Sequence, residues 1–181
     1  PRLMCPVPAY HTPVLAQPAV EWVVGDPNGI YVDGTLGGGG HAQLILDRLQ
    51  PLGRLIGIDR DPEAVAEAKL RLDAFGSQLI AVRRPFGAIR QTLEMLGISR
   101  ITGAIFDLGV SSHQIDDFHR GFSYLQDGPL DMRMDPDAGK SARDVVNGYS
   151  LESLTRIFRD FGEERAAGPI ARAICAKRSD V

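Results

Sequence analysis

The sequence has few cysteines, little net charge and no long hydrophobic run. Cys5 and Cys175 are its two cysteines, and no partner spacing links them. This favours free thiols in a reducing compartment and leaves a disulfide as the open alternative. The formal net charge of −3 is mildly acidic and not the excess of basic residues typical of nucleic-acid-binding proteins. Any RNA contact must therefore come from a local patch. No apolar run approaches the roughly 20 residues of a membrane span, and no signal peptide is visible. We therefore expect a cytoplasmic protein with no membrane partner.

Short apolar runs alternate with helical patterns along the first part of the chain. The expected strands are 29–35, 53–61, 78–86 and 101–109, and the expected helices are 42–49, 62–75 and 89–96, the last closed by Gly97. This alternation predicts βαβ units and a parallel sheet covered on both faces. Ligands of such sheets bind at the carboxyl ends of the strands. The residues found there are Asp33, Asp59, Phe86 and Asp107, so we expect one site built from four strand ends.

The pattern changes after Gly109. Residues 110–139 are rich in Asp, Gly, Ser and Pro, and helical patterns follow at 141–147, 150–161 and 163–177. We therefore predict one domain at 1–109, which carries the four strand ends, and a loop with a small helical subdomain at 110–181.

Four consecutive glycines, 37–40, separate the first expected strand from the first expected helix. Gly37, Gly39 and Ala42 match the dinucleotide pattern G-x-G-x-x-A, and Asp59 follows about 20 residues later, where a carboxylate suits a ribose diol. This motif fits NAD and S-adenosylmethionine about equally well. Asp33 and Asp107 add a negative wall, which is better tolerated beside a cationic methyl donor than beside a pyrophosphate.

Several strings of the sequence are more specific than the glycine loop. In chain order they are "HTPVL", "VDGTLGGGGH", "GIDRDPEA", "FDLGVSSHQID", "RGFSY", "DGPLDMRMDP" and "FGEERAAGPIARAI". Together they resemble the bacterial ribosomal RNA small-subunit methyltransferase H family, also called MraW. The resemblance implies an α/β fold with the Rossmann-like parallel sheet of class I methyltransferases. It also implies transfer of a methyl group from S-adenosylmethionine to N4 of a cytidine in small-subunit (16S) ribosomal RNA. The resemblance further implies that the domain at 1–109 binds S-adenosylmethionine and that the loop and helical subdomain at 110–181 recognise the substrate. The expected partner is that RNA or the ribosomal subunit, and a homodimer is left open.

The same resemblance implies roles for individual residues. Gly39, Gly40 and His41 would contact the cofactor, Asp59 its ribose and Phe86 its adenine, with Asp107 and Gln114 near its reactive end. One departure is His113, where the family usually has proline. Family members also continue further, with the remaining strands and a "FHSLEDR"-type segment. Only the first strands are therefore expected here, and the sheet should end near its fourth strand with an edge that is normally paired.

Other interpretations of these residues stay open. Without the resemblance Phe86 would be a core residue, and His41, which has no acid beside it in the sequence, would have a structural role. The run 130–135 alternates apolar with charged residues, a pattern that would suit an edge strand. Arg120, Arg133 and Arg143 are more typical of solvated ion pairs than of phosphate contacts.

For the chemistry, we hypothesise that Asp107 is catalytic and polarises the cytosine amine, directly or through Ser111 or Ser112, with no metal ion. Two alternative functions are an NAD-dependent oxidoreductase and a cofactor-binding fragment without activity.

Overall fold

The computed structural model describes residues 15–178. Cys5 and the first four residues of the "HTPVL" motif lie outside this range. Cys175 is a free thiol. The chain divides into two compact units, the first ending at His113 and the second beginning at Gln114. This division falls four residues after the predicted boundary at 109, and each unit is described by itself.

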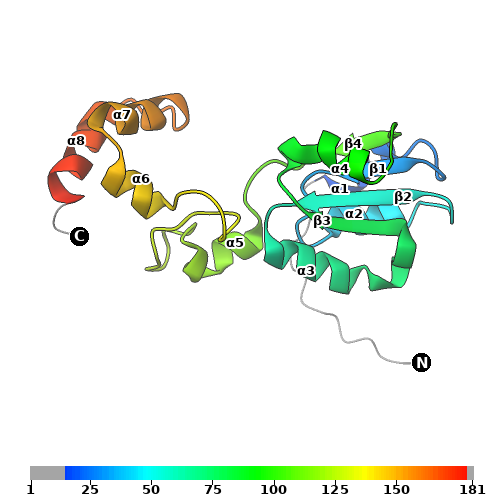
Figure 1. The fold of residues 1–181 in the computed structure, drawn as a ribbon. Coiled ribbons are helices and arrows are strands. Elements are labelled where there is room, and N and C mark those ends of the chain that lie inside the picture. Colours follow the sequence, from blue (N-terminus) through cyan, green and yellow to red (C-terminus); the bar gives the residue numbers. More distant parts are fainter. Residues whose placement is uncertain (1–14, 179–181) are drawn as a thin grey trace. The chain divides into compact units, whose positions relative to one another are not determined.

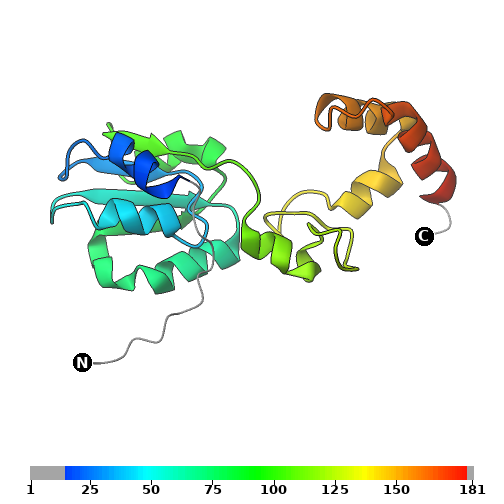
Figure 2. The same ribbon diagram turned by 180° about the vertical axis from the view of Figure 1, so that it is seen from behind.

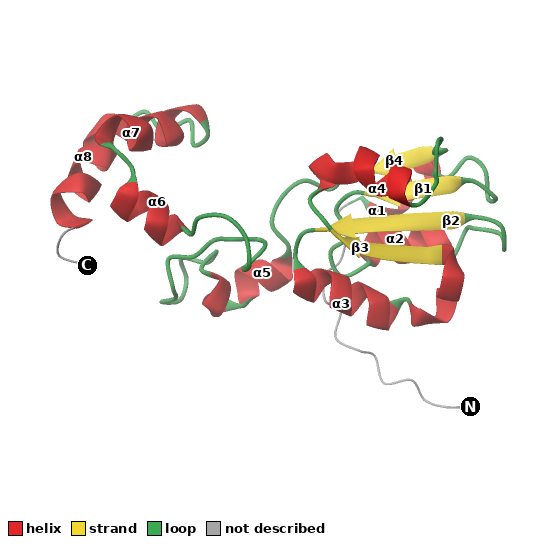
Figure 3. Ribbon diagram, viewed as in Figure 1, coloured by secondary structure: helices red, strands yellow, loops and turns green. Residues whose placement is uncertain are grey.

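The first unit is built on a parallel sheet of four strands (Figures 1 and 3). The strands are β1 (Ile30–Asp33), β2 (Arg54–Asp59), β3 (Leu79–Arg83) and β4 (Gly103–Ile105), in the order β3-β2-β1-β4. Val32 of β1 lies opposite Ile56 of β2 on one side and Ala104 of β4 on the other. The four predicted strands and their parallel arrangement are thus confirmed, each strand being shorter than the apolar run that predicted it.

Helices pack on both faces of this sheet. On one face Tyr31 and Leu55 form a core with Val20 of α1 (Ala16–Val23), Ile45 of α2 (Gly40–Leu46) and Ala68 of α3 (Pro62–Arg71). On the other face the core consists of Val32, Ile56 and Ile58, against which Ile89 and Leu93 of α4 (Ile89–Met95) pack. Figure 1 shows α4 in front of the sheet, and Figure 2, from behind, shows α1 and α2. Side chains alternate between faces along a strand, so β1 and β2 supply both cores.

The central strands match the expectation of a sheet covered on both faces, whereas β3 does not. β1 and β2 are almost wholly buried, but β3 is half-exposed along its length. The reason is that β3 forms one edge of the sheet. β4 forms the other edge and pairs, among the described strands, with β1 alone. The predicted end of the sheet at its fourth strand is therefore found within the described residues.

Some helix boundaries differ from the prediction. Helix α1 was not predicted; its Pro18 lies in the first turn, where proline is tolerated. Helix α3 ends at Arg71 rather than at 75 and is followed by a 3₁₀ segment, η1 (Asp73–Gln78), interrupted by Gly76 at φ 52°. Helix α3 begins at Pro62 as predicted, and the Asp61 carboxylate caps it by accepting the Glu63 N–H at 3.1 Å. Helix α4 ends before Gly97, which has φ 68°.

The second unit is helical with a long irregular segment. The boundary between the units falls within α5 (Ser112–Asp116). The other helices of the second unit are η3 (Phe118–Arg120), α6 (Ala142–Gly148), α7 (Leu151–Asp160) and α8 (Ala167–Lys177). The last three correspond to the predicted helices, although α8 begins later than residue 163, where Glu163 takes the left-handed conformation with φ 50°. Among the described residues, no helix has the length and apolarity needed to cross a bilayer.

Two interpretations of the irregular segment are wrong. The run 130–135 is a loop and not an edge strand, because Met132 has φ 61° and cannot continue an extended chain. Arg120 is buried and not a solvated surface residue. Its guanidinium donates to the carbonyl oxygens of Met134 at 2.8 Å and Arg133 at 3.2 Å. Arg133 does form the expected ion pair, with Asp131 at 2.7 Å, and this hydrogen-bonded pair lowers the pKa of the Asp131 carboxyl.

Candidate functional site

The glycine loop lies between β1 and α2 and is bound to the end of β2. The Leu36 N–H donates to the Ile58 carbonyl at 3.0 Å, and the Gly37 N–H donates to Oδ2 of Asp59 at 2.8 Å. The turn then closes through the Gly39 N–H, which donates to the Leu36 carbonyl at 2.9 Å. The loop is therefore positioned by the same strand whose last residue is the predicted ribose acid.

Two of the four glycines are required by the fold itself. Gly37 and Gly39 have φ values of +50° and +82°, in the region that side chains rarely occupy. At Gly39 space is also lacking, since a Cβ there would lie 2.9 Å from Cδ1 of Leu72, whereas at Gly37 the nearest atom would be 3.9 Å away. Close packing of the loop on α3 thus accounts for part of the glycine run.

Asp59 joins the loop to the beginning of α3. Its Oδ1 accepts the Asp61 N–H at 3.0 Å, while its Oδ2 accepts Gly37 as described. An ionised carboxylate has about four acceptor directions. Two backbone bonds fix its orientation and leave capacity for a pair of ligand hydroxyls.

Asp107 follows β4 and is held from the loop after β1. Its backbone N–H donates to Oγ1 of Thr35 at 2.7 Å, and its side chain stays 43 % exposed. Oδ2 of Asp107 lies 4.0 Å from Nδ1 of His41, whose side chain is nearly buried. In the sequence no acidic residue stands beside His41. In the fold Asp107, which follows β4, lies next to it.

Asp33 is the most unusual group of the site. It is 1 % exposed; its Oδ1 accepts the Thr35 N–H at 3.1 Å, and its Oδ2 has no hydrogen-bond partner. Burial, with smaller contributions from the negative charges of Asp59 and Asp107, raises the pKa of the Asp33 carboxyl from 3.8 to about 7. The Thr35 hydrogen bond opposes this rise without cancelling it.

Two aromatic rings lie at the ends of β3 and β4. Phe86, in η2 (Phe86–Ala88) after β3, and Phe106, just before Asp107, are 41 % and 45 % exposed. Their ring centroids are 6.1 Å apart with an interplanar angle of 73°. Phe106 also covers Gly34, where a Cβ would overlap its ring. The interpretation of Phe86 as a core residue is therefore wrong, and exposed aromatic rings at a strand end offer an apolar surface to a planar ligand.

The structure thus brings together most of the predicted site residues. At the carboxyl edge of the first unit lie Gly39, Gly40, His41, Asp59, Phe86 and Asp107. Gln114 lies on α5 in the second unit and is buried, so its part in this site stays a prediction. Thr35 and Phe106 were not singled out from the sequence. Phe106 could have been, as the bulky residue directly before the acid that ends its strand.

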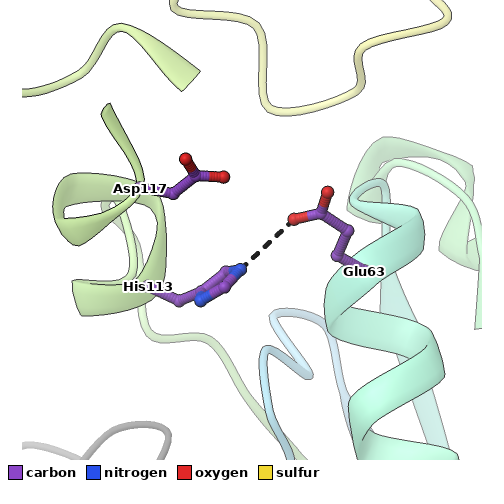
Figure 4. A group of neighbouring side chains, drawn as sticks. All are labelled: Glu63, His113 and Asp117. Atoms are coloured by element: carbon purple, nitrogen blue, oxygen red, sulfur yellow. Dashed lines mark hydrogen bonds and ion pairs between the residues drawn. The ribbon is translucent and has the colours of Figure 1, made fainter. Parts of the chain in front are cut away.

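His113 stands where the family usually has proline. Its Nε2 lies 3.2 Å from Oε2 of Glu63 at the beginning of α3 (Figure 4). Figure 4 also draws Asp117, which belongs to the second unit. The histidine therefore contributes a contact within the first unit that a proline ring could not make.

The sheet, its helices and the acids at its strand ends define a Rossmann-like α/β protein with a candidate cofactor site at the carboxyl edge. The model of the MraW methylase family matches residues 8–181. This chain belongs to that family, as its sequence motifs predicted.

Curated relatives agree with this assignment. The chain is 51 % identical over 172 residues to the ribosomal RNA small subunit methyltransferase H of Syntrophus aciditrophicus, covering 95 % of this chain and 55 % of the relative. It is 48 % identical over 171 residues to the protein of the same name from Geotalea uraniireducens, covering 94 % and 55 %. The chain thus spans about half the length of the curated relatives it matches. Among solved structures, a putative rRNA methylase from Clostridium thermocellum is similar over 41 % of this chain and 42 % of its own, with 17 % identity and a TM-score of 0.37.

Proposed function

We propose that this chain binds S-adenosylmethionine at the carboxyl edge of its sheet and is part of an enzyme that methylates N4 of a cytidine in small-subunit ribosomal RNA. Membership of the MraW methylase family supports a methyltransferase, and the names of the relatives support ribosomal RNA as the substrate. The first unit would bind the donor and the second would recognise the RNA, free or in the ribosomal subunit, in the cytoplasm.

The main observation in support of this proposal is the concentration of acidic groups at the site. Asp33, Asp59 and Asp107 gather around the glycine loop, and among the described residues none of them forms an ion pair with lysine or arginine. A sulfonium donor carrying an ammonium group brings positive charge to these acids, whereas the pyrophosphate of NAD brings negative charge. Asp59 would accept the ribose hydroxyls, and the rings of Phe86 and Phe106 would contact the adenine. The residues present therefore fit S-adenosylmethionine better than NAD.

The transferred methyl group comes from the donor, and the chain's own residues orient the acceptor. The exocyclic amine of cytosine is a weak nucleophile because its lone pair is delocalised into the ring. Asp107 has an exposed carboxylate on a backbone fixed by Thr35, so it would accept a hydrogen bond from that amine and hold it in line for transfer. Orientation of this kind supplies up to roughly 7–11 kcal/mol in the best cases. The base must first leave its stack, at a cost of a few kcal/mol.

Calorimetric titration of the chain with S-adenosylmethionine, with NADH as competitor, tests the donor site. We expect binding that NADH leaves unchanged. Asp59→Ala should weaken it by about 1.5–3 kcal/mol, the usual contribution of hydrogen bonds to a charged group. Asp73→Ala, which removes an exposed acid of η1, is the matched control and should bind as the wild type does. Displacement of the donor by NADH would instead favour the oxidoreductase.

The role of Asp107 requires two separate measurements on the same variant. Asp107→Ala should lower methylation of small-subunit RNA by far more than it lowers donor affinity, because the hydrogen bond to the amine is made to the acceptor. Near-normal methylation by this variant would contradict the catalytic assignment. Donor binding without methylation by the unaltered chain would identify it as a cofactor-binding fragment.

A further inference from the structure

One atom of the site is buried, polar and unsatisfied. Oδ2 of Asp33 has no hydrogen-bond partner, and the residue is 1 % exposed at the end of the central strand β1. An ionised carboxylate that lacks both water and a partner is costly, so such a group holds its proton until something compensates the charge. Since Oδ1 already accepts the Thr35 N–H, this compensation has to come from elsewhere in the site.

The charged neighbours of Asp33 do not supply a positive charge that would compensate its carboxylate. Asp59 at the end of β2 and Asp107 after β4 are both acids, and both disfavour ionisation of Asp33. From α2 the titratable group is His41, which lies beside Asp107 at 4.0 Å. Among the described residues, the largest charge contributions to the pKa of Asp33 come from these two acids and none from a lysine or arginine, and burial raises that pKa to about 7. The site therefore has three acids but holds fewer than three negative charges near neutral pH.

We propose that Asp33 is the proton-releasing acid of the donor site: binding of the cationic methyl donor is coupled to ionisation of the buried Asp33 carboxyl. A positive charge at the carboxyl edge stabilises the anion of Asp33, and the anion in turn stabilises the bound cation. The O–H bond of Asp33 breaks, its electron pair stays on the carboxylate, and the proton passes to solvent buffer. No other co-reactant is needed, and the inference rests on the proposed binding of S-adenosylmethionine.

Linkage gives the sign of the effect. Below about pH 7 the free site is protonated, so binding must expel a proton and donor affinity rises with pH, by up to about tenfold per unit. Above about pH 7 the carboxylate is already ionised and this dependence levels off. The thioether product, S-adenosylhomocysteine, lacks the sulfonium charge and should release a smaller fraction of a proton than the donor does.

The test is calorimetric titration of the full chain at about pH 7 with S-adenosylmethionine and with S-adenosylhomocysteine, each in two buffers of different ionisation enthalpy. The difference in binding enthalpy between the two buffers gives the number of protons released. About half a proton should be released, since the Asp33 carboxyl of the free chain is half ionised at about pH 7. Asp33→Asn carries no titratable group and should lose this release and the rise of affinity with pH. The control Asp73→Asn should keep both.

Carbon-detected NMR of the aspartate carboxyl groups in the wild-type chain makes the test independent of the variant. One buried aspartate should titrate near neutral pH without ligand and should become ionised when S-adenosylmethionine is added. Equal proton counts for the wild type and Asp33→Asn, or an Asp33 carbon unchanged by the donor, would overturn the inference and leave donor binding standing. Absence of donor binding by the wild type would overturn both.

Discussion

At the residue scale, Asp33 also contributes to the pH dependence of stability. Its pKa is raised from 3.8 to about 7 in the folded chain, so the folded state binds the proton more tightly than the unfolded state. Its contribution is fully present below about pH 4, and it is lost as the pH rises through about 7. A shift of this size corresponds to roughly 4 kcal/mol.

We therefore expect Asp33→Asn to lose this part of the pH dependence and to be more stable than the wild type above about pH 7. Urea unfolding at a series of pH values measures the free energy of unfolding of both proteins. Asp73→Asn should follow the wild-type curve. Parallel pH profiles for the wild type and Asp33→Asn would show that Asp33 is not protonated in the fold.

The glycine loop offers a second comparison at this scale. Alanine at Gly37 or Gly39 would have to adopt a positive φ, at a cost of about 1–2 kcal/mol. At Gly39 the new methyl group also meets Leu72, and overpacking adds about 1–3 kcal/mol. Gly39→Ala should therefore lower the unfolding free energy more than its control Gly37→Ala does, as measured by urea unfolding. Equal losses would mean that α3 yields to the methyl group without cost.

At the scale of elements, Arg120 holds the irregular segment of the second unit. Its two hydrogen bonds to carbonyl oxygens bind residues 133–134 to η3 from within a buried position. Arg120→Lys removes the planar fork and should destabilise the second unit by about 1.5–3 kcal/mol, because buried hydrogen bonds from a charged group are lost.

Arg133 is the matched control for this change. It lies in the same segment, but it forms a more exposed ion pair with Asp131. Arg133→Lys should cost less than about 1 kcal/mol, as solvated pairs do. Hydrogen exchange of the amides of η3 and residues 129–135 separates the two variants, and equal protection in both would contradict the role given to Arg120.

At the scale of the whole molecule, both hydrophobic clusters of the sheet and the three acids of the candidate site lie before residue 113. A piece comprising residues 1–113 should therefore unfold cooperatively in urea and bind S-adenosylmethionine. Its affinity should be lower than that of the chain by the contribution of Gln114. Gln114→Ala in the full chain is the control and should show the same loss. A piece that folds but does not bind would place further donor contacts in the second unit.

Much of the first unit could be predicted from local sequence. Short apolar runs and helical periodicity depend on neighbouring residues alone, so the four strands, α2, α3 and α4 were found, with errors of a few residues at their ends. Sequence strings also identified the family. Helix α1 was missed and residues 130–135 were misjudged, because packing and a positive φ at Met132 decided those segments.

The charge state and burial of individual side chains were decided only by the tertiary structure. The sequence by itself determined that acids would stand at the ends of parallel strands, and it named most of them. Only the fold placed His41 beside Asp107, removed water from Asp33 and buried Arg120 under its own loop. Desolvation and Coulomb interactions depend on distance in space and not along the chain. For this reason the placement of acids at the strand ends was predictable from sequence, whereas the raised pKa of the Asp33 carboxyl was not.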